Sequence, residues 1–142
     1  MTRILAGAAL LLGLAGALMG ILEAHALVRT SFAHLYAYAI AQMVVCAAAV
    51  IIAHRSFQEE IRSDPRNWHR PILRLAPRWA KLVCVAGICG SVAYFISAVG
   101  GGVSVTDWAA AAPQERAALF VGFSIFNYLA LVGLSAAAER AA

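Results

Sequence analysis

The apolar residues of this chain gather in four long runs, at residues 4–24, 32–53, 79–99 and 117–138. An α-helix rises about 1.5 Å per residue, so roughly 20 residues cross the roughly 30 Å hydrocarbon layer of a bilayer. No run alternates apolar with polar residues as barrel strands do, and backbone groups in lipid must satisfy their own hydrogen bonds. The pattern predicts an all-α membrane protein, a four-transmembrane-helix bundle.

Composition agrees with a membrane domain. Hydrophobic residues make up 63% of the 142 residues and charged residues 13%, whereas soluble domains carry about 25% charged residues. No change of composition marks a second unit, so residues 1–142 are expected to form a single domain.

The basic residues concentrate in and beside the loop at residues 54–78, between the second and third runs. This region holds Arg55, Arg62, Arg66, Arg70, Arg74, Arg78 and Lys81, while the other two connections hold only Arg29 and Arg116. Cytoplasmic loops retain Lys and Arg. The asymmetry predicts that this loop and both termini are cytoplasmic, in a multi-pass protein of the cell inner membrane.

The location of these residues also decides how the net charge of +4 is interpreted. Basic residues beside a membrane are attracted to anionic headgroups, and here they are not interleaved with aromatic residues that stack on bases. We therefore expect contact with anionic lipid rather than with nucleic acid, through Arg62, Arg66, Arg70, Arg74 and Arg78. An ordinary cytoplasmic loop without a ligand would carry the same residues.

Three prolines, Pro65, Pro71 and Pro77, divide this basic loop. Proline suits the first turn of a helix and breaks its interior. The loop is therefore expected to form short helical pieces lying on the membrane, with Asp64 as a cap and Pro77 at the entry to the third span. Four apolar side chains are expected to dip into the interface, those of Trp68, Ile72, Leu73 and Trp79.

Several features stand together in the second half of the chain: Trp68, Leu73, the sequence Ala76-Pro77-x-Trp79, and three glycines from Gly100 onward. In these features the chain resembles, from about residue 55, a family of small, uncharacterised bacterial four-span membrane proteins. The usual Cys-Pro of that family is Ala-Pro here. The resemblance implies an inner-membrane protein with four spans. It transfers no functional residue, because the family has no assigned activity.

The N-terminus also permits a different interpretation, because residues 24–26 resemble the A-x-A cleavage site of a secretory signal. Cleavage would leave three spans. The apolar run before the triplet is about 20 residues long, however, and a signal core has roughly 7 to 15. We therefore expect the first span to be retained.

The first span carries a seam of small residues at alternating steps of three and four: Ala6, Ala9, Gly13, Gly16 and Gly20, followed by Glu23. Small residues let helix backbones approach closely in lipid, and Gly16-x-x-x-Gly20 has the spacing of such contacts. Gly13, Gly16 and Gly20 are therefore predicted to form a packing face. The partner is either another span of the bundle or a second chain.

Ionisable residues near the outer end of the first two spans are candidates for function. Glu23 is expected to be protonated or paired with Arg29. A haem held by His25 and His34, or a metal held by Glu23 and one histidine, is geometrically conceivable, but no established ligand motif supports either. Cofactors and metals are therefore not predicted. The thiols Cys46, Cys84 and Cys89 lie in predicted spans without C-x-x-C spacing, which indicates no disulfide framework.

Two amides, Gln42 and Asn127, each lie about ten residues from the outer end of a predicted span, which places both near the bilayer midplane. An unpaired polar group in hydrocarbon costs several kcal/mol. We therefore expect both amides to face the interior and to bond each other, with Ser124 and Ser91 completing the network. The alternative is that they line a polar pathway.

Three classes of function remain open. The leading hypothesis is a non-enzymatic accessory or scaffold component of a membrane complex, with a membrane-protein partner or a homo-oligomer, because no nucleophile, base or metal set converges. A small transporter or proton-linked exchanger is the alternative, resting on Glu23 and on a polar stripe of His34, Tyr38 and Gln42. A haem-binding or enzymatic membrane protein is the third, with only His25, His34, His54 and His69 to carry it.

Overall fold

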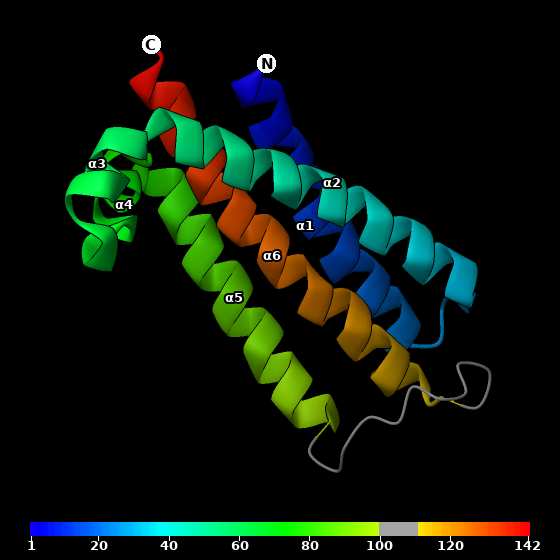
Figure 1. The fold of residues 1–142 in the computed structure, drawn as a ribbon. Coiled ribbons are helices and arrows are strands. Elements are labelled where there is room, and N and C mark those ends of the chain that lie inside the picture. The colour runs from blue at the N-terminus through cyan, green and yellow to red at the C-terminus, as the bar shows by residue number, and fades with distance from the viewer. Residues whose placement is uncertain (100–110) are drawn as a thin grey trace.

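The computed structural model describes residues 1–99 and 111–142, and the glycines from Gly100 onward lie outside the described part. Within it the secondary structure is helical throughout (Figure 1). Four of the helices are long and apolar enough to cross a membrane: α1 (Thr2–Ala24), α2 (Phe32–Ser56), α5 (Arg78–Val99) and α6 (Pro113–Arg140). The predicted all-α, four-helix bundle is confirmed. Three short pieces join α2 to α5: α3 (Gln58–Ser63), η1 (Pro65–Asn67) and α4 (His69–Leu75).

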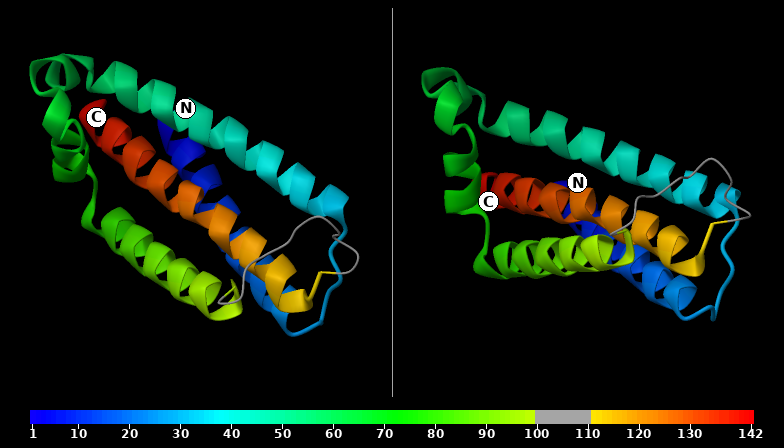
Figure 2. Two further views of the ribbon diagram at one scale, coloured as in Figure 1. Left: turned by 60° about the horizontal axis from the view of Figure 1, so that its bottom comes forward. Right: turned by 90° about the horizontal axis from the view of Figure 1, so that it is seen from below.

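Helix α6 forms the centre of the bundle. It lies between α2 and α5, with α1 packed along a further side, and these neighbours appear in all the views (Figures 1 and 2). Most of its residues from Arg116 to Ala138 are buried, whereas α1, α2 and α5 expose large apolar side chains on their outer faces. Both chain termini lie at the end of the bundle that carries α3 and α4 (Figure 1). The last run of the sequence is therefore the core helix.

The small-residue seam of α1 faces α6 of the same chain. A Cβ atom built on Gly13 would lie 2.7 Å from Tyr128 Cε1, and one built on Gly20 would lie 3.2 Å from the Ala117 carbonyl oxygen. At Gly16 it would lie 3.1 Å from the Phe120 carbonyl oxygen. Of the two alternatives for the seam, the structure has the contact within the bundle.

The segment between α2 and α5 folds against the end of α6 instead of lying apart from it. Asp64 caps η1, accepting a hydrogen bond from the Asn67 backbone N–H at 3.3 Å, and α5 begins directly after Pro77. Ile72 was expected in the membrane interface, and this is wrong. It is buried in a cluster with Phe57, Ala76, Cys84, Tyr128, Val132, Ala136 and Ala137, because α4 turns its apolar face toward α6.

The C-terminal end of α6 is tied to α3 by a charged contact. Arg140 Nη1 donates to Glu60 Oε1, and the guanidinium of Arg140 lies 4.9 Å from the centre of the buried Phe57 ring. The hydrogen bond from Arg140 lowers the pKa of Glu60 below its ordinary value. These contacts hold α3 over this end of the bundle.

The α1–α6 contact predicts different effects for two glycines of one helix. Gly16→Ala should lower the free energy of unfolding by about 1–3 kcal/mol, because the added methyl group crowds Tyr38 and the Phe120 carbonyl. Gly7→Ala is the control, since no atom lies within 4 Å of its new Cβ, and alanine is the better helix former. Unfolding in detergent, followed by circular dichroism, measures both. Equal stability of the two variants would contradict this packing.

Candidate functional site

The carboxylate of Glu23 is part of a buried ion pair between the last turn of α1 and the first turn of α6. Arg116 Nε donates to Glu23 Oε1, and the Thr30 backbone N–H donates to Oε2 at 2.8 Å. Arg116 Nη1 also donates to the Ala111 carbonyl oxygen at 2.6 Å. The partner in this structure is thus Arg116, not the Arg29 expected from sequence. Arg116 lies 93 residues from Glu23, and only the packing of α6 on α1 brings it there.

The two histidines near this end of the bundle lie at its surface. Both His25 and His34 are exposed. His34 Nδ1 accepts a hydrogen bond from the Ser31 backbone N–H at 3.2 Å and lies 2.7 Å from Ser31 Oγ, so this ring fastens the start of α2. Within residues 1–99 and 111–142 there is no group of three or more His, Cys, Asp or Glu residues placed to hold a metal ion.

Tyr38 is the centre of the polar contacts near mid-bundle. Its hydroxyl donates to the Leu12 carbonyl oxygen at 3.0 Å and accepts a hydrogen bond from Asn127 Nδ2 at 3.2 Å. Three helices, α1, α2 and α6, therefore meet at one phenol. Asn127 is fully buried and Gln42 is 5% exposed, so both face the interior.

The expected direct bond between Gln42 and Asn127 is replaced by the bond from Asn127 to Tyr38. Depth along the helix axis places the two amides at one level, but it does not show which side chain of α2 reaches α6. Among the described residues, Gln42 Oε1 and Asn127 Oδ1 have no hydrogen-bond partner. Both amides thus keep an unused acceptor inside the bundle.

A second set of polar contacts joins α5 and α1 to α6. Ser91 Oγ and Ser124 Oγ lie 3.3 Å apart, and Ser124 Oγ also donates to the Val121 carbonyl oxygen at 2.6 Å. Tyr128 Oη donates to the Gly13 carbonyl oxygen at 3.1 Å. The role of Tyr128 was missed by sequence reasoning. Its position one turn after Ser124 was the available signal, but an aromatic residue in a span is more often a packing residue.

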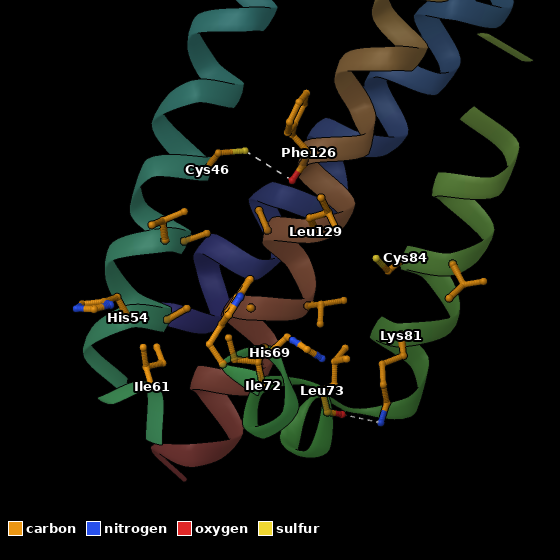
Figure 3. A pocket seen from close by; sticks show the side chains of 18 residues that line it. Cys46, His54, Ile61, His69, Ile72, Leu73, Lys81, Cys84, Phe126 and Leu129 are labelled. Atoms are coloured by element: carbon orange, nitrogen blue, oxygen red, sulfur yellow. Dashed lines mark hydrogen bonds between the residues drawn. The ribbon is translucent and has the colours of Figure 1, made fainter. Parts of the chain in front are cut away.

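A lateral groove, which the sequence did not indicate, runs between α2 and α5 over the outer side of α6 (Figure 3). Its volume is about 880 Å³, and its lining is almost wholly apolar. Phe126 and Leu129 of α6 form its floor and are 54% and 52% exposed. Val50 of α2 and Val85 of α5 line its sides. In the sequence these residues are indistinguishable from ordinary lipid-facing side chains.

The groove has a polar end, where α4 and the start of α5 close it (Figure 3). His54, Trp68, His69 and Lys81 lie among the lining residues there. Lys81 Nζ donates to the Leu73 carbonyl oxygen at 3.1 Å. At the opposite part of the groove, Cys46 Sγ donates to the Phe126 carbonyl oxygen at 3.6 Å. Apolar surface and basic groups thus follow each other along one groove.

The five arginines expected to meet anionic lipid lie around this polar end but do not line the groove. All five are exposed, and in the described part of the chain none of them forms an ion pair: Arg62, Arg66, Arg70, Arg74 and Arg78. Their side chains therefore lie at the surface of this segment.

Searches of protein-family models, curated proteins and solved structures find no match to this chain. The resemblance to the bacterial four-span family stays a prediction.

The buried ion pair predicts a coupled response to substitution. Glu23→Gln or Arg116→Gln alone should destabilise the fold by about 3–5 kcal/mol, because each leaves a buried charge without its partner. The double variant should recover part of that loss. A double-mutant cycle from unfolding in detergent measures the coupling. Additive losses would contradict a direct interaction.

The hydroxyl of Tyr38 provides a smaller test. Tyr38→Phe removes two interhelical hydrogen bonds, and such bonds contribute on average about 0.6 kcal/mol each in membrane proteins. A loss of roughly 1 kcal/mol is expected. Tyr36→Phe is the matched control, because Tyr36 lies two residues away and is 60% exposed. If both variants have the same free energy of unfolding, the Tyr38 hydroxyl does not link the helices.

Proposed function

We propose that this chain is a non-enzymatic accessory protein of a membrane, and that its working element is the lateral groove, which holds an apolar ligand from the lipid layer. The groove itself carries the proposal. Its volume lies within the range of about 300–1,000 Å³ typical of ligand sites, and its lining is apolar with a few polar groups at one end. Its floor is made by exposed side chains of the core helix, Phe126 and Leu129.

The groove also has a rigid frame, which favours binding over incidental packing with lipid. Its floor is α6, the most buried helix, and its sides are α2 and α5. One end is closed by α4, whose Ile72 is buried in the core. A ligand site of this kind is preformed, so little ordering of the protein opposes binding. Partner recruitment by the accessory protein, whether of another membrane protein or of a second copy, would act alongside this site.

The contacts of the candidate residues favour this function over the two alternatives. A proton-linked exchanger needs an ionisable group that changes partners during transport, whereas Glu23 is enclosed by Arg116 and the Thr30 N–H at the end of the bundle. Haem ligation would rest on His25 and His34 alone at this end, and the His34 ring is already used to fasten the start of α2 to Ser31. We further infer, from the basic residues of the α3–α4 segment, that this end faces the cytoplasm in an inner membrane.

A photoactivatable lipid tests the groove as a binding site. The purified full chain is reconstituted with phosphatidylcholine that carries a diazirine in its acyl chain, and the labelled peptides are mapped by mass spectrometry. Labelling is expected to concentrate on the groove residues of α2, α5 and α6. Leu129→Trp should reduce it severalfold, because the larger side chain fills the groove from its floor.

Leu14→Trp is the matched control for this experiment. Leu14 lies on α1, is also 52% exposed, and does not line the groove. It should leave the labelling of α2, α5 and α6 unchanged. Uniform labelling of all outward-facing side chains would overturn the proposed function. Equal labelling of the parent and Leu129→Trp would do the same.

A further inference from the structure

The polar end of the groove is built around Lys81. This residue lies in the first turn of α5 and reaches back to the Leu73 carbonyl oxygen, at 3.1 Å, in the last turn of α4 (Figure 3). Carbonyl groups in the last turn of a helix lack helical partners, so this bond also caps α4. An ammonium group has three donors. One is used by Leu73, and in the described part of the chain no hydrogen bond is found for the other two.

His69 also lies at this end of the groove. It is the first residue of α4, its ring is exposed, and it stands edge-on to the Trp68 ring with 6.0 Å between ring centres. Both residues line the groove. Trp68 is 52% exposed, and tryptophan is enriched at the level of lipid headgroups. The end of the groove therefore combines donor groups with an aromatic ring suited to the interface.

The electrostatic surroundings of this end are positive. Residues 54–81 contain seven Lys or Arg and three acidic residues. Two of these acids are engaged elsewhere, Glu60 with Arg140 and Asp64 with Asn67. This excess of basic residues attracts an anion, and low-dielectric walls strengthen that attraction.

The order of groups along the groove matches an amphiphile. Donors and basic charge lie at the α4 end, and an apolar channel over Phe126 and Leu129 follows toward the middle of the span. A phospholipid presents the same order, with phosphate at the interface and acyl chains below it. A helix of a partner protein would fill the apolar part but would leave the Lys81 donors unmatched.

We propose that the lateral groove is a binding site for an anionic phospholipid, with the phosphate held by Lys81 and His69 and an acyl chain lying over Leu129. This inference rests on the proposed function and deepens it by assigning the headgroup class. Arg70 and Arg74, exposed on α4, add to the attraction without lining the groove.

Native mass spectrometry of the full chain from mild detergent tests the assignment. The probes are phosphatidylglycerol and phosphatidylcholine with identical acyl chains, added in turn. The parent should retain phosphatidylglycerol at least about tenfold better than phosphatidylcholine. Lys81→Gln should reduce that preference about fivefold, as expected for about 1 kcal/mol per basic residue at an anionic surface. His69→Gln should reduce it less, and Lys81→Arg should restore it.

Arg55→Gln is the matched control. It removes one positive charge from an exposed side chain of α2 that does not line the groove. It should retain most of the preference. Circular dichroism checks that each variant is folded, and Lys81→Arg keeps the test decisive if Lys81→Gln does not fold, since it should then bind phosphatidylglycerol as the parent does.

The other outcomes separate this inference from the proposed function. Equal effects of Arg55→Gln and Lys81→Gln would overturn the headgroup site in favour of a diffuse basic surface. Equal retention of the two lipids, with binding still lost in Leu129→Trp, would overturn the inference and leave the apolar site standing. Retention of both lipids by Leu129→Trp would remove both proposals. A second copy or another protein retained in place of lipid would also overturn the inference.

Discussion

The backbones of α1 and α6 approach each other so closely that one methyl group added at Gly16 would meet the Phe120 carbonyl oxygen. In lipid there is little hydrophobic gain from bringing two apolar helices together, so association depends on close packing and interhelical hydrogen bonds. The seam of small residues on α1 supplies that packing. It also brings the last turn of α1 to Arg116, and the Gly13 carbonyl to the hydroxyl of Tyr128.

This contact makes α6 the central helix, and the remaining spans arrange themselves around it. Ser91 joins α5 to Ser124, and Tyr38 of α2 reaches Asn127 as well as α1. Helices α2 and α5 each pack mainly on α6 and not on each other, which leaves the side of α6 with Phe126 and Leu129 exposed. The lateral groove therefore arises because α2 and α5 both pack on the central helix α6 and not on each other. Packing of α4 against α6 then closes one end of it.

The polar residues of the interior serve this arrangement first. Glu23, Tyr38, Ser124 and Tyr128 each bond a group on a different helix. A polar group without a partner in hydrocarbon is costly, so such bonds select which faces meet even where each adds little stability. The proposed ligand site lies instead at the lateral groove, where apolar surface meets the basic α3–α4 segment.

The sequence by itself determined the number and length of the spans, the basic segment between the second and third, and the packing face of α1, because length, charge and residue spacing are local properties of the chain. Depth along each helix was also readable, which is why Gln42 and Asn127 were correctly expected to be buried. Lateral neighbours were not. Whether Glu23 meets Arg29 or Arg116, whether Asn127 meets Gln42 or Tyr38, and whether Phe126 and Leu129 face bulk lipid or a groove depend on how each helix is rotated and which helix lies beside it. Those choices arise from contacts between residues far apart in the chain, so only the tertiary structure decided them.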